Sequence, residues 1–200
     1  VGAGFDQRDA SRPAIVNIDG ISVGVIARCE TQFGSAQRGK PGVATLRASI
    51  FEEIQNLRSQ VDVVIASIHG AQEMLPWPSP ARVELFRALI DAGVSIVHGH
   101  HSHVPQGWEQ YKHGYIFYGL GNFAIDVRHW MQHPNALWSL LPVIDLDFHG
   151  TGTMKVHIDT SVIVSGDESH EVRIRHAAPD ETAVHQQYLA VANRPLNDSK

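Results

Sequence analysis

The sequence predicts an α/β fold in which helices cover a central mixed sheet. Short β-branched runs alternate with helical patterns between residues 43 and 121, as in successive strand–helix–strand units. After residue 140, strand-like runs follow one another without helices between them, which predicts antiparallel pairing. The 200 residues, 43% of them hydrophobic, suffice for one domain over residues 1–200 with a sizeable core, and we expect the tail to fray after about residue 195.

The N-terminal elements begin with a hairpin. Residues 14–27 contain two apolar runs joined by Asp19-Gly20, a pair that accepts the positive φ angles of a tight turn. Residues 31–42 are polar and glycine-rich, which predicts a long loop. Apolar residues then recur at helical spacing over residues 43–60, and residues 61–68 have the composition of a buried strand.

The next elements continue the alternation. Residues 79–93 predict a helix, with Ser79 as its cap, Pro80 in its first turn and Gly93 as its stop. Strands are predicted over residues 94–97 and 115–121. Nearer the C-terminus, the sequence predicts an antiparallel hairpin around "HGTG", a strand at "EVRIRH" and a final helix at "DETAVHQQYLAVAN".

Composition excludes several classes of protein. A net charge of −5 argues against a broad nucleic-acid surface, and the single Cys29 excludes an internal disulfide. The sequence contains neither the Gly-x-Ser-x-Gly elbow of serine hydrolases nor a phosphate-binding P-loop. The 13 histidines against 16 lysines and arginines favour metal or proton chemistry.

Histidines and an asparagine follow three predicted strands. His69 follows one strand, the run "HGHHSH" at residues 98–103 follows the next, and Asn122 follows the third. Since ligands collect at the carboxyl ends of parallel strands, we expect these side chains to meet at one edge of the sheet. A metal site, a histidine-rich polar turn and a pH-sensitive surface are the three candidate explanations.

Metal binding explains this pattern best. Neutral imidazole binds zinc, manganese or iron, and a His-x-His pair places two nitrogens close together. Asn122 offers an amide oxygen to a metal or an amide N–H to an anionic substrate. Glu73 and Asp126 are the acidic side chains close in sequence, so few carboxylates are available to offset the charge of two metals.

The run from Ser67 to Asp126 resembles the bacterial capsule synthesis family, the CapA-like poly-γ-glutamate biosynthesis proteins of the metallophosphatase (calcineurin-like) superfamily. Weaker similarity extends from the N-terminus to about residue 150. The resemblance rests on several motifs in order, which are His69-Gly70, Pro78-Ser79-Pro80, Leu89 to Gly93, Gly99 to Val104 and Ile116 to Phe123.

The resemblance implies a metallophosphatase-like α/β/β/α sandwich with mixed sheets, of which this chain is the C-terminal two-thirds. The family's early acidic motifs have no counterpart here. The implied cofactors are divalent manganese, zinc or iron ions. The implied site residues are His69, His100, His101 and His103 as metal ligands, His101 and Asn122 as catalytic groups, and Asn122, Glu73 and Trp77 as substrate-binding groups.

The implied function is that of a metal-dependent phosphoesterase linked to capsule or poly-γ-glutamate biosynthesis. The alternative is a non-catalytic protein that binds, helps to make or exports the capsule polymer. The expected partners are an anionic or phosphorylated small molecule or polymer and the capsule-synthesis machinery, with no nucleic acid. We expect a soluble domain, either cytoplasmic or anchored on the outer face of a membrane, because no apolar run reaches the roughly 18 residues of a membrane span.

Overall fold

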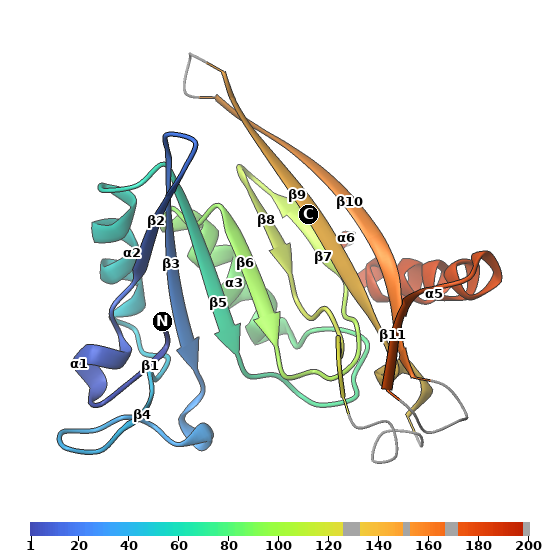
Figure 1. The fold of residues 1–200 in the computed structure, drawn as a ribbon, viewed down its shortest axis with the longest axis horizontal. Coiled ribbons are helices and arrows are strands. Elements are labelled where there is room, and N and C mark those ends of the chain that lie inside the picture. The colour runs from blue at the N-terminus through green and yellow to red at the C-terminus, as the bar shows by residue number, and fades with distance from the viewer. Residues whose placement is uncertain (126–132, 150–152, 167–171, 198–200) are drawn as a thin grey trace.

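A six-stranded mixed sheet forms the centre of the fold (Figure 1). The computed structural model describes residues 1–125, 133–149, 153–166 and 172–197. Four central strands run parallel and an antiparallel strand closes each edge. In spatial order the strands are β2 (Ala14–Ile18), β3 (Ile21–Cys29), β5 (Val63–His69), β6 (Ile96–His100), β8 (Gly114–Phe117) and β7 (Trp108–Tyr111). The predicted α/β class with mixed sheets is confirmed.

Two helices cover one face of this sheet. α2 (Ile50–Arg58) and α3 (Pro80–Asp91) contribute buried apolar side chains that pack against those of β5 and β6. Each strand presents alternate residues to this core, so Val64, Ala66 and Ile68 of β5 are fully buried. The helices therefore form a layer on one face of the mixed sheet, as the predicted α/β class requires.

The turn between β2 and β3 and the two ends of α3 form as the sequence predicts. Asp19 and Gly20 join β2 to β3 with φ angles of 51° and 87°. Ser79 caps α3, because its hydroxyl accepts a hydrogen bond from the Arg82 amide at 3.3 Å, and Gly93 ends the following turn at φ 116°. The predicted hairpin and the predicted second helix are confirmed.

The predicted start of the first long helix, at residue 43, is wrong, because the residues before Ile50 pair with other segments of the chain and are not helical. β4 (Gly42–Val43) pairs with β1 (Ala3–Gly4). The Leu46 amide then donates to the Cys29 carbonyl at 2.8 Å. These contacts hold residues 42–46 extended, so α2 begins only at Ile50. α1 (Gln7–Ala10) lies beside this small pair of strands.

Strand boundaries also differ near the histidines. The strand predicted over residues 94–97 runs instead from Ile96 to His100, because its parallel pairing with β5 continues to the His69–His100 pair. β7 was not predicted, and it pairs Trp108 with Phe117 of β8. The predicted strand over residues 115–121 ends early, at Phe117.

A second, antiparallel sheet stands beside the β7 edge in Figure 1. It consists of β9 (Trp138–His149), β10 (Thr153–Gly166) and β11 (Val172–His176), which confirms the predicted C-terminal hairpin and strand. α5 (Pro179–Ala192) packs Tyr188 and Leu189 against a cluster around Trp138 and Leu140. The final helix is therefore confirmed as well.

The start of α5 carries an acid-sensitive contact. The Glu181 carboxylate accepts hydrogen bonds from Arg175 at 2.6 Å and 2.7 Å and from the Ala178 amide at 2.7 Å, and these contacts lower its pKa to about 2. The folded state therefore favours the charged carboxylate. Its contribution to stability is present above the unfolded pKa of about 4.3 and is lost as the pH falls through about 2.

We predict that Glu181→Gln lowers the free energy of unfolding by less than about 1 kcal/mol at pH 6, because the pair is partly exposed. The difference from the unchanged chain should disappear near pH 2. Urea unfolding at pH 6, 4 and 2 measures it, and a difference that grows on acidification would contradict the assignment.

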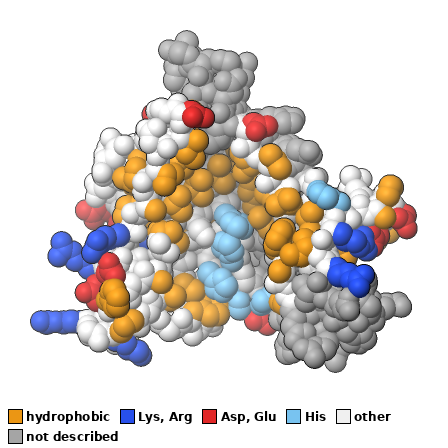
Figure 2. Space-filling view, viewed as in Figure 1, with side chains coloured by type: hydrophobic (Ala, Val, Ile, Leu, Met, Phe, Trp, Pro, Cys, Tyr) orange, Lys and Arg blue, Asp and Glu red, His pale blue; other side chains and the backbone are white. Residues whose placement is uncertain are grey.

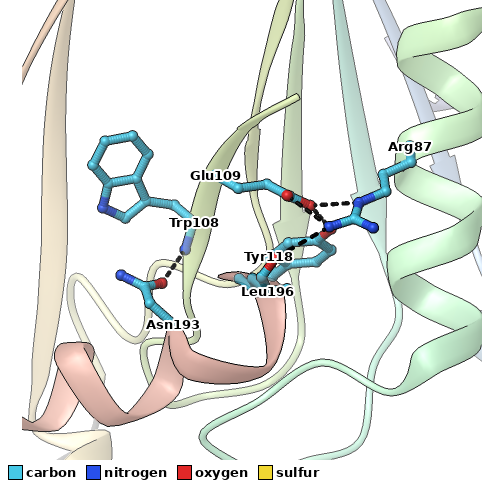
Figure 3. A network of polar contacts seen from close by, with 6 residues as sticks. All are labelled: Arg87, Trp108, Glu109, Tyr118, Asn193 and Leu196. Atoms are coloured by element: carbon cyan, nitrogen blue, oxygen red, sulfur yellow. Dashed lines mark hydrogen bonds and ion pairs between the residues drawn. The ribbon is translucent and has the colours of Figure 1, made fainter. Parts of the chain in front are cut away.

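The last described residues of the chain return to the main body, and the fraying predicted after about residue 195 stays a prediction for the residues that follow. Leu196 of α6 (Arg194–Asn197) is 1% exposed and belongs to the core under α2 and α3. Arg87 donates to the Leu196 carbonyl at 3.4 Å, and the Asn193 side chain accepts from the Trp108 amide at 2.9 Å (Figure 3).

The face of the six-stranded sheet opposite α2 and α3 carries apolar side chains around a stripe of histidines (Figure 2). Along β5, Ile65, Ser67 and His69 are the half-buried residues of this face. In the described part of the chain, every helix is too short or too polar to span a lipid bilayer.

Candidate metal centre

The parallel pairing brings the carboxyl ends of the central strands to one edge of the sheet. His69 ends β5, His100 ends β6, and the two residues are paired in register. Beyond them lies a cavity of about 190 Å³. It is lined by His69, His98, Gly99, His100, His101, Ser102, His103, Leu120, Gly121 and Asn122. The structure thus brings together the four histidines assigned as ligands and Asn122.

The turn after β6 has an unusual backbone. His101 and His103 adopt φ angles of 85° and 59°, in a region of backbone conformation that residues other than glycine rarely occupy. Ser102 between them is buried, and its hydroxyl donates to the Val104 carbonyl at 2.8 Å. The Met74 amide donates to the Ser102 carbonyl at 2.9 Å, which ties the loop after β5 to this turn. Strained residues of this kind concentrate at functional sites.

Within the described part of the chain, Glu73, His101 and His103 form a group of three side chains that could hold a metal ion. One ligand atom from each lies within 4.8 Å of the other two. The nearest Glu73 oxygen is 3.3 Å from His101 Nε2, and the Glu73 side chain is 51% exposed. The sequence suggested Glu73 as a substrate-binding group and as one of two nearby acids, and the fold brings its carboxylate to His101 and His103, where it could hold a metal with them. Asp126, the other acid considered, lies outside the described residues.

Asn122 holds His103 in one tautomer. The Asn122 amide donates to the Ala136 carbonyl at 2.9 Å, which orients its oxygen towards His103. That oxygen is 2.9 Å from His103 Nδ1 and can only accept, so Nδ1 carries the proton and Nε2 keeps its lone pair for a metal. Both polar ends of Asn122 are thus engaged within the protein, and this contact could orient His103 for a metal. The substrate-binding and catalytic roles suggested for Asn122 stay predictions.

Three further histidines, His69, His98 and His100, line the same cavity. His100 Nε2 is 2.9 Å from the Ser67 hydroxyl, and its ring centroid is 3.8 Å from that of His98. The His69 ring lies 5.0 Å from that of His101 and edge-on to Phe33 at 4.8 Å. Burial lowers the pKa of His69 and His100, and it lowers the pKa of His98 to about 4. These rings are therefore neutral at pH 7, the form that binds metal.

Trp77 does not join this group. It lines a different cavity, together with Arg82 and Gln106. The sequence also gave no sign of Phe33 or Ser67, which contact the histidine rings. Serine and phenylalanine are common in strands and loops, so neither residue type indicated a site.

The donor set fits a divalent transition metal. Two imidazoles and one carboxylate are the ligands that zinc, manganese and iron accept, and three protein ligands leave coordination positions open, as in catalytic sites. The half-exposed Glu73 shows that the group is reached from solvent.

Comparisons with known proteins agree with the motifs. The family model described as "Bacterial capsule synthesis protein PGA_cap" matches residues 1–127. The "Capsule biosynthesis protein CapA" of Bacillus anthracis is 32% identical over 133 residues, which cover 63% of this chain and 32% of that protein.

Two further relatives are similar. The "PGA biosynthesis protein CapA" of Bacillus subtilis (strain 168) is 31% identical over 160 residues, which cover 78% of this chain and 41% of that protein. A "Probable polyglutamine synthesis accessory protein" of Mycobacterium tuberculosis is 32% identical over 140 residues, which cover 63% of this chain and 37% of that protein. The chain thus spans between a third and two-fifths of the length of these relatives.

The matched residues 1–127 include β5 and β6 with their terminal histidines, the turn that carries His101 and His103, and Asn122, so the family match and the candidate metal-ligating group fall on the same part of the fold. The chain belongs to the bacterial capsule synthesis protein family.

Proposed function

We propose that this chain carries the histidine part of a divalent-metal centre that hydrolyses phosphoesters in capsule or poly-γ-glutamate biosynthesis. The observation that carries the proposal is the convergence of Glu73, His101 and His103 within 4.8 Å. The capsule role is supported by the family and by the names of its relatives.

Each residue has a defined task in this proposal. Glu73, His101 and His103 hold the metal, and Asn122 keeps His103 in the tautomer that binds it. His69 and His100 line the same cavity as neutral imidazoles, available as further ligands or as proton acceptors. A bound divalent metal supplies Lewis acidity towards a phosphoryl oxygen and lowers the pKa of water. The substrate is an anionic, phosphorylated small molecule or polymer.

A non-catalytic role is the second candidate. The relatives carry names that speak of biosynthesis and, for the mycobacterial protein, of an accessory role. In this role the same cavity would bind an anionic capsule polymer, or contact the capsule-synthesis machinery, without chemical turnover.

Hydrolysis of p-nitrophenyl phosphate and bis-p-nitrophenyl phosphate tests the choice. We expect turnover of at least one substrate by the purified chain with manganese or zinc, and loss of turnover with a chelator. The rate should fall as the pH drops below about 6, because protons then compete with the metal for imidazole.

Two outcomes would count against the hydrolase. Turnover that survives both the chelator and His103→Asn would exclude this metal group as the catalyst. Stoichiometric bound metal without turnover on either ester would favour the non-catalytic role, and association with purified capsule polymer would then be the measurement to make.

A further inference from the structure

A second cavity lies beside the N-terminus of α3, and it shares no lining residue with the histidine cavity. Its volume is about 260 Å³, and Glu30, Trp77, Ser79, Arg82 and Gln106 are among the residues that line it. Nothing in the proposed metal chemistry uses these side chains.

Arg82 contributes a buried positive charge with a spare donor. Its side chain is 7% exposed, and its Nη2 donates to Glu30 Oε1 at 2.7 Å. Its Nη1 is buried without a hydrogen-bond partner. An arginine retains its charge in proteins, so an unpaired N–H of this group favours an anionic oxygen as its partner.

Gln106 contributes a buried acceptor. The residue is 1% exposed, and its Nε2 donates to the carbonyls of Leu75 and Trp77 at 3.0 Å and 3.3 Å. These two bonds fix the orientation of the amide, and its Oε1 is left buried without a partner. Of the five buried side-chain atoms that lack a partner among the described residues, this one and Arg82 Nη1 belong to side chains lining the same cavity.

The helix start adds a further attraction for anions. Ser79 and Ala81 of the first turn of α3 line the cavity, and α3 extends over 12 residues. The free amides and the dipole at a helix N-terminus favour negative charge. Glu30 opposes this attraction, because its carboxylate lines the same cavity with 39% of its side chain exposed.

We propose that this cavity is a binding site for an oxyanion that carries its own hydrogen-bond donor, as a hydrogen phosphate group does. The anionic oxygens of the group accept from Arg82, and its O–H donates to Gln106 Oε1. A sulfate ion has similar size and charge but no proton to donate at neutral pH, so the site discriminates against it. The site is separate from the metal group and does not depend on the proposed hydrolysis.

Calorimetric titration of the chain with inorganic phosphate and with sulfate at pH 7 tests the proposal. A chelator is present throughout, so that no metal contributes to phosphate binding. We expect phosphate to bind at least about 10-fold more tightly than sulfate, because sulfate leaves the buried acceptor unpaired. Equal binding of the two ions, or no binding of either, would overturn the proposal.

Two variants of the ion pair should change phosphate affinity in opposite directions. Arg82→Gln should weaken binding at least about 10-fold, because it removes a charged donor. Glu30→Gln should strengthen binding about 2- to 5-fold, because it removes a competing negative charge while keeping an oxygen for Arg82. A general loss of structure cannot strengthen binding, so Glu30→Gln remains informative even if Arg82→Gln fails to fold.

Lys112→Gln is the matched control, since it removes one exposed positive charge at the other end of α3, where Lys112 pairs with Asp91. It should leave phosphate affinity unchanged. If it weakens binding as much as Arg82→Gln does, phosphate responds to the overall charge of the protein and not to a defined site, and the proposal is overturned. Unchanged or weaker binding by Glu30→Gln would also overturn the proposal. Glycerol phosphate identifies the source of the group: tighter binding than inorganic phosphate indicates the end of a larger ligand, and weaker binding indicates the free ion.

Discussion

Replacing His103 should weaken binding of zinc or manganese by at least about 100-fold, a larger loss than the 10- to 100-fold typical when a residue that supports a ligand is removed. In the proposed centre His103 would supply one of three ligand atoms, and its Nε2 is available because Asn122 holds the proton on Nδ1. Since the backbone at His103 has φ 59°, His103→Asn is the better variant, because asparagine tolerates this conformation. Calorimetric titration of the metal-free chain measures the loss.

A second histidine variant serves as the control, and a variant of Asn122 should give a smaller loss of metal affinity. His113→Ala changes an exposed histidine of the β7–β8 turn and should leave metal affinity unchanged. Asn122→Ala should weaken binding by about 10- to 100-fold, because His103 is then free to rotate or change tautomer. Full metal affinity in His103→Asn would show that the metal, if bound, is held by other residues.

Glu109→Ala should destabilise the fold by about 3–5 kcal/mol, the typical cost of leaving one member of a buried ion pair without its partner. The Glu109 side chain is 1% exposed and accepts from Arg87 Nε and Nη2 at 2.9 Å and 2.8 Å. It also accepts from the Tyr118 hydroxyl at 2.7 Å (Figure 3). The substitution removes the acceptor for three donors and leaves the Arg87 charge, 15% exposed, without its carboxylate. Equilibrium unfolding in urea measures the loss.

Asp91→Ala provides a matched control on α3, the helix that carries Arg87, the partner of Glu109. Asp91 pairs with Lys112 at the surface, where both side chains are about half exposed. Such a pair contributes less than about 1 kcal/mol, so this variant should remain close to the unchanged chain in stability. A Glu109→Ala variant no less stable than Asp91→Ala would mean that the buried network does not hold α3, β7 and β8 together.

The sequence by itself determined the elements whose signals are local. Asp19-Gly20 set the hairpin turn, and Ser79, Pro80 and Gly93 set both ends of α3. The apolar, β-branched composition of residues 61–68 predicted β5. The position of His69 and of the histidine run at strand ends followed from the order of elements, and the sheet then brought them to one edge, because parallel strands end on the same side.

Only the tertiary structure decided the contacts that join distant segments. The approach of Glu73 to His101 depends on a bond between Met74 and Ser102, and the state of His103 depends on Asn122 and Ala136. The late start of α2 and the extension of β6 to His100 come from pairing with other strands. A sequence pattern reports what each residue prefers within one or two turns of chain. Hydrogen bonds and burial between residues far apart depend on how complete elements pack, and that packing decided which carboxylate joins the histidines.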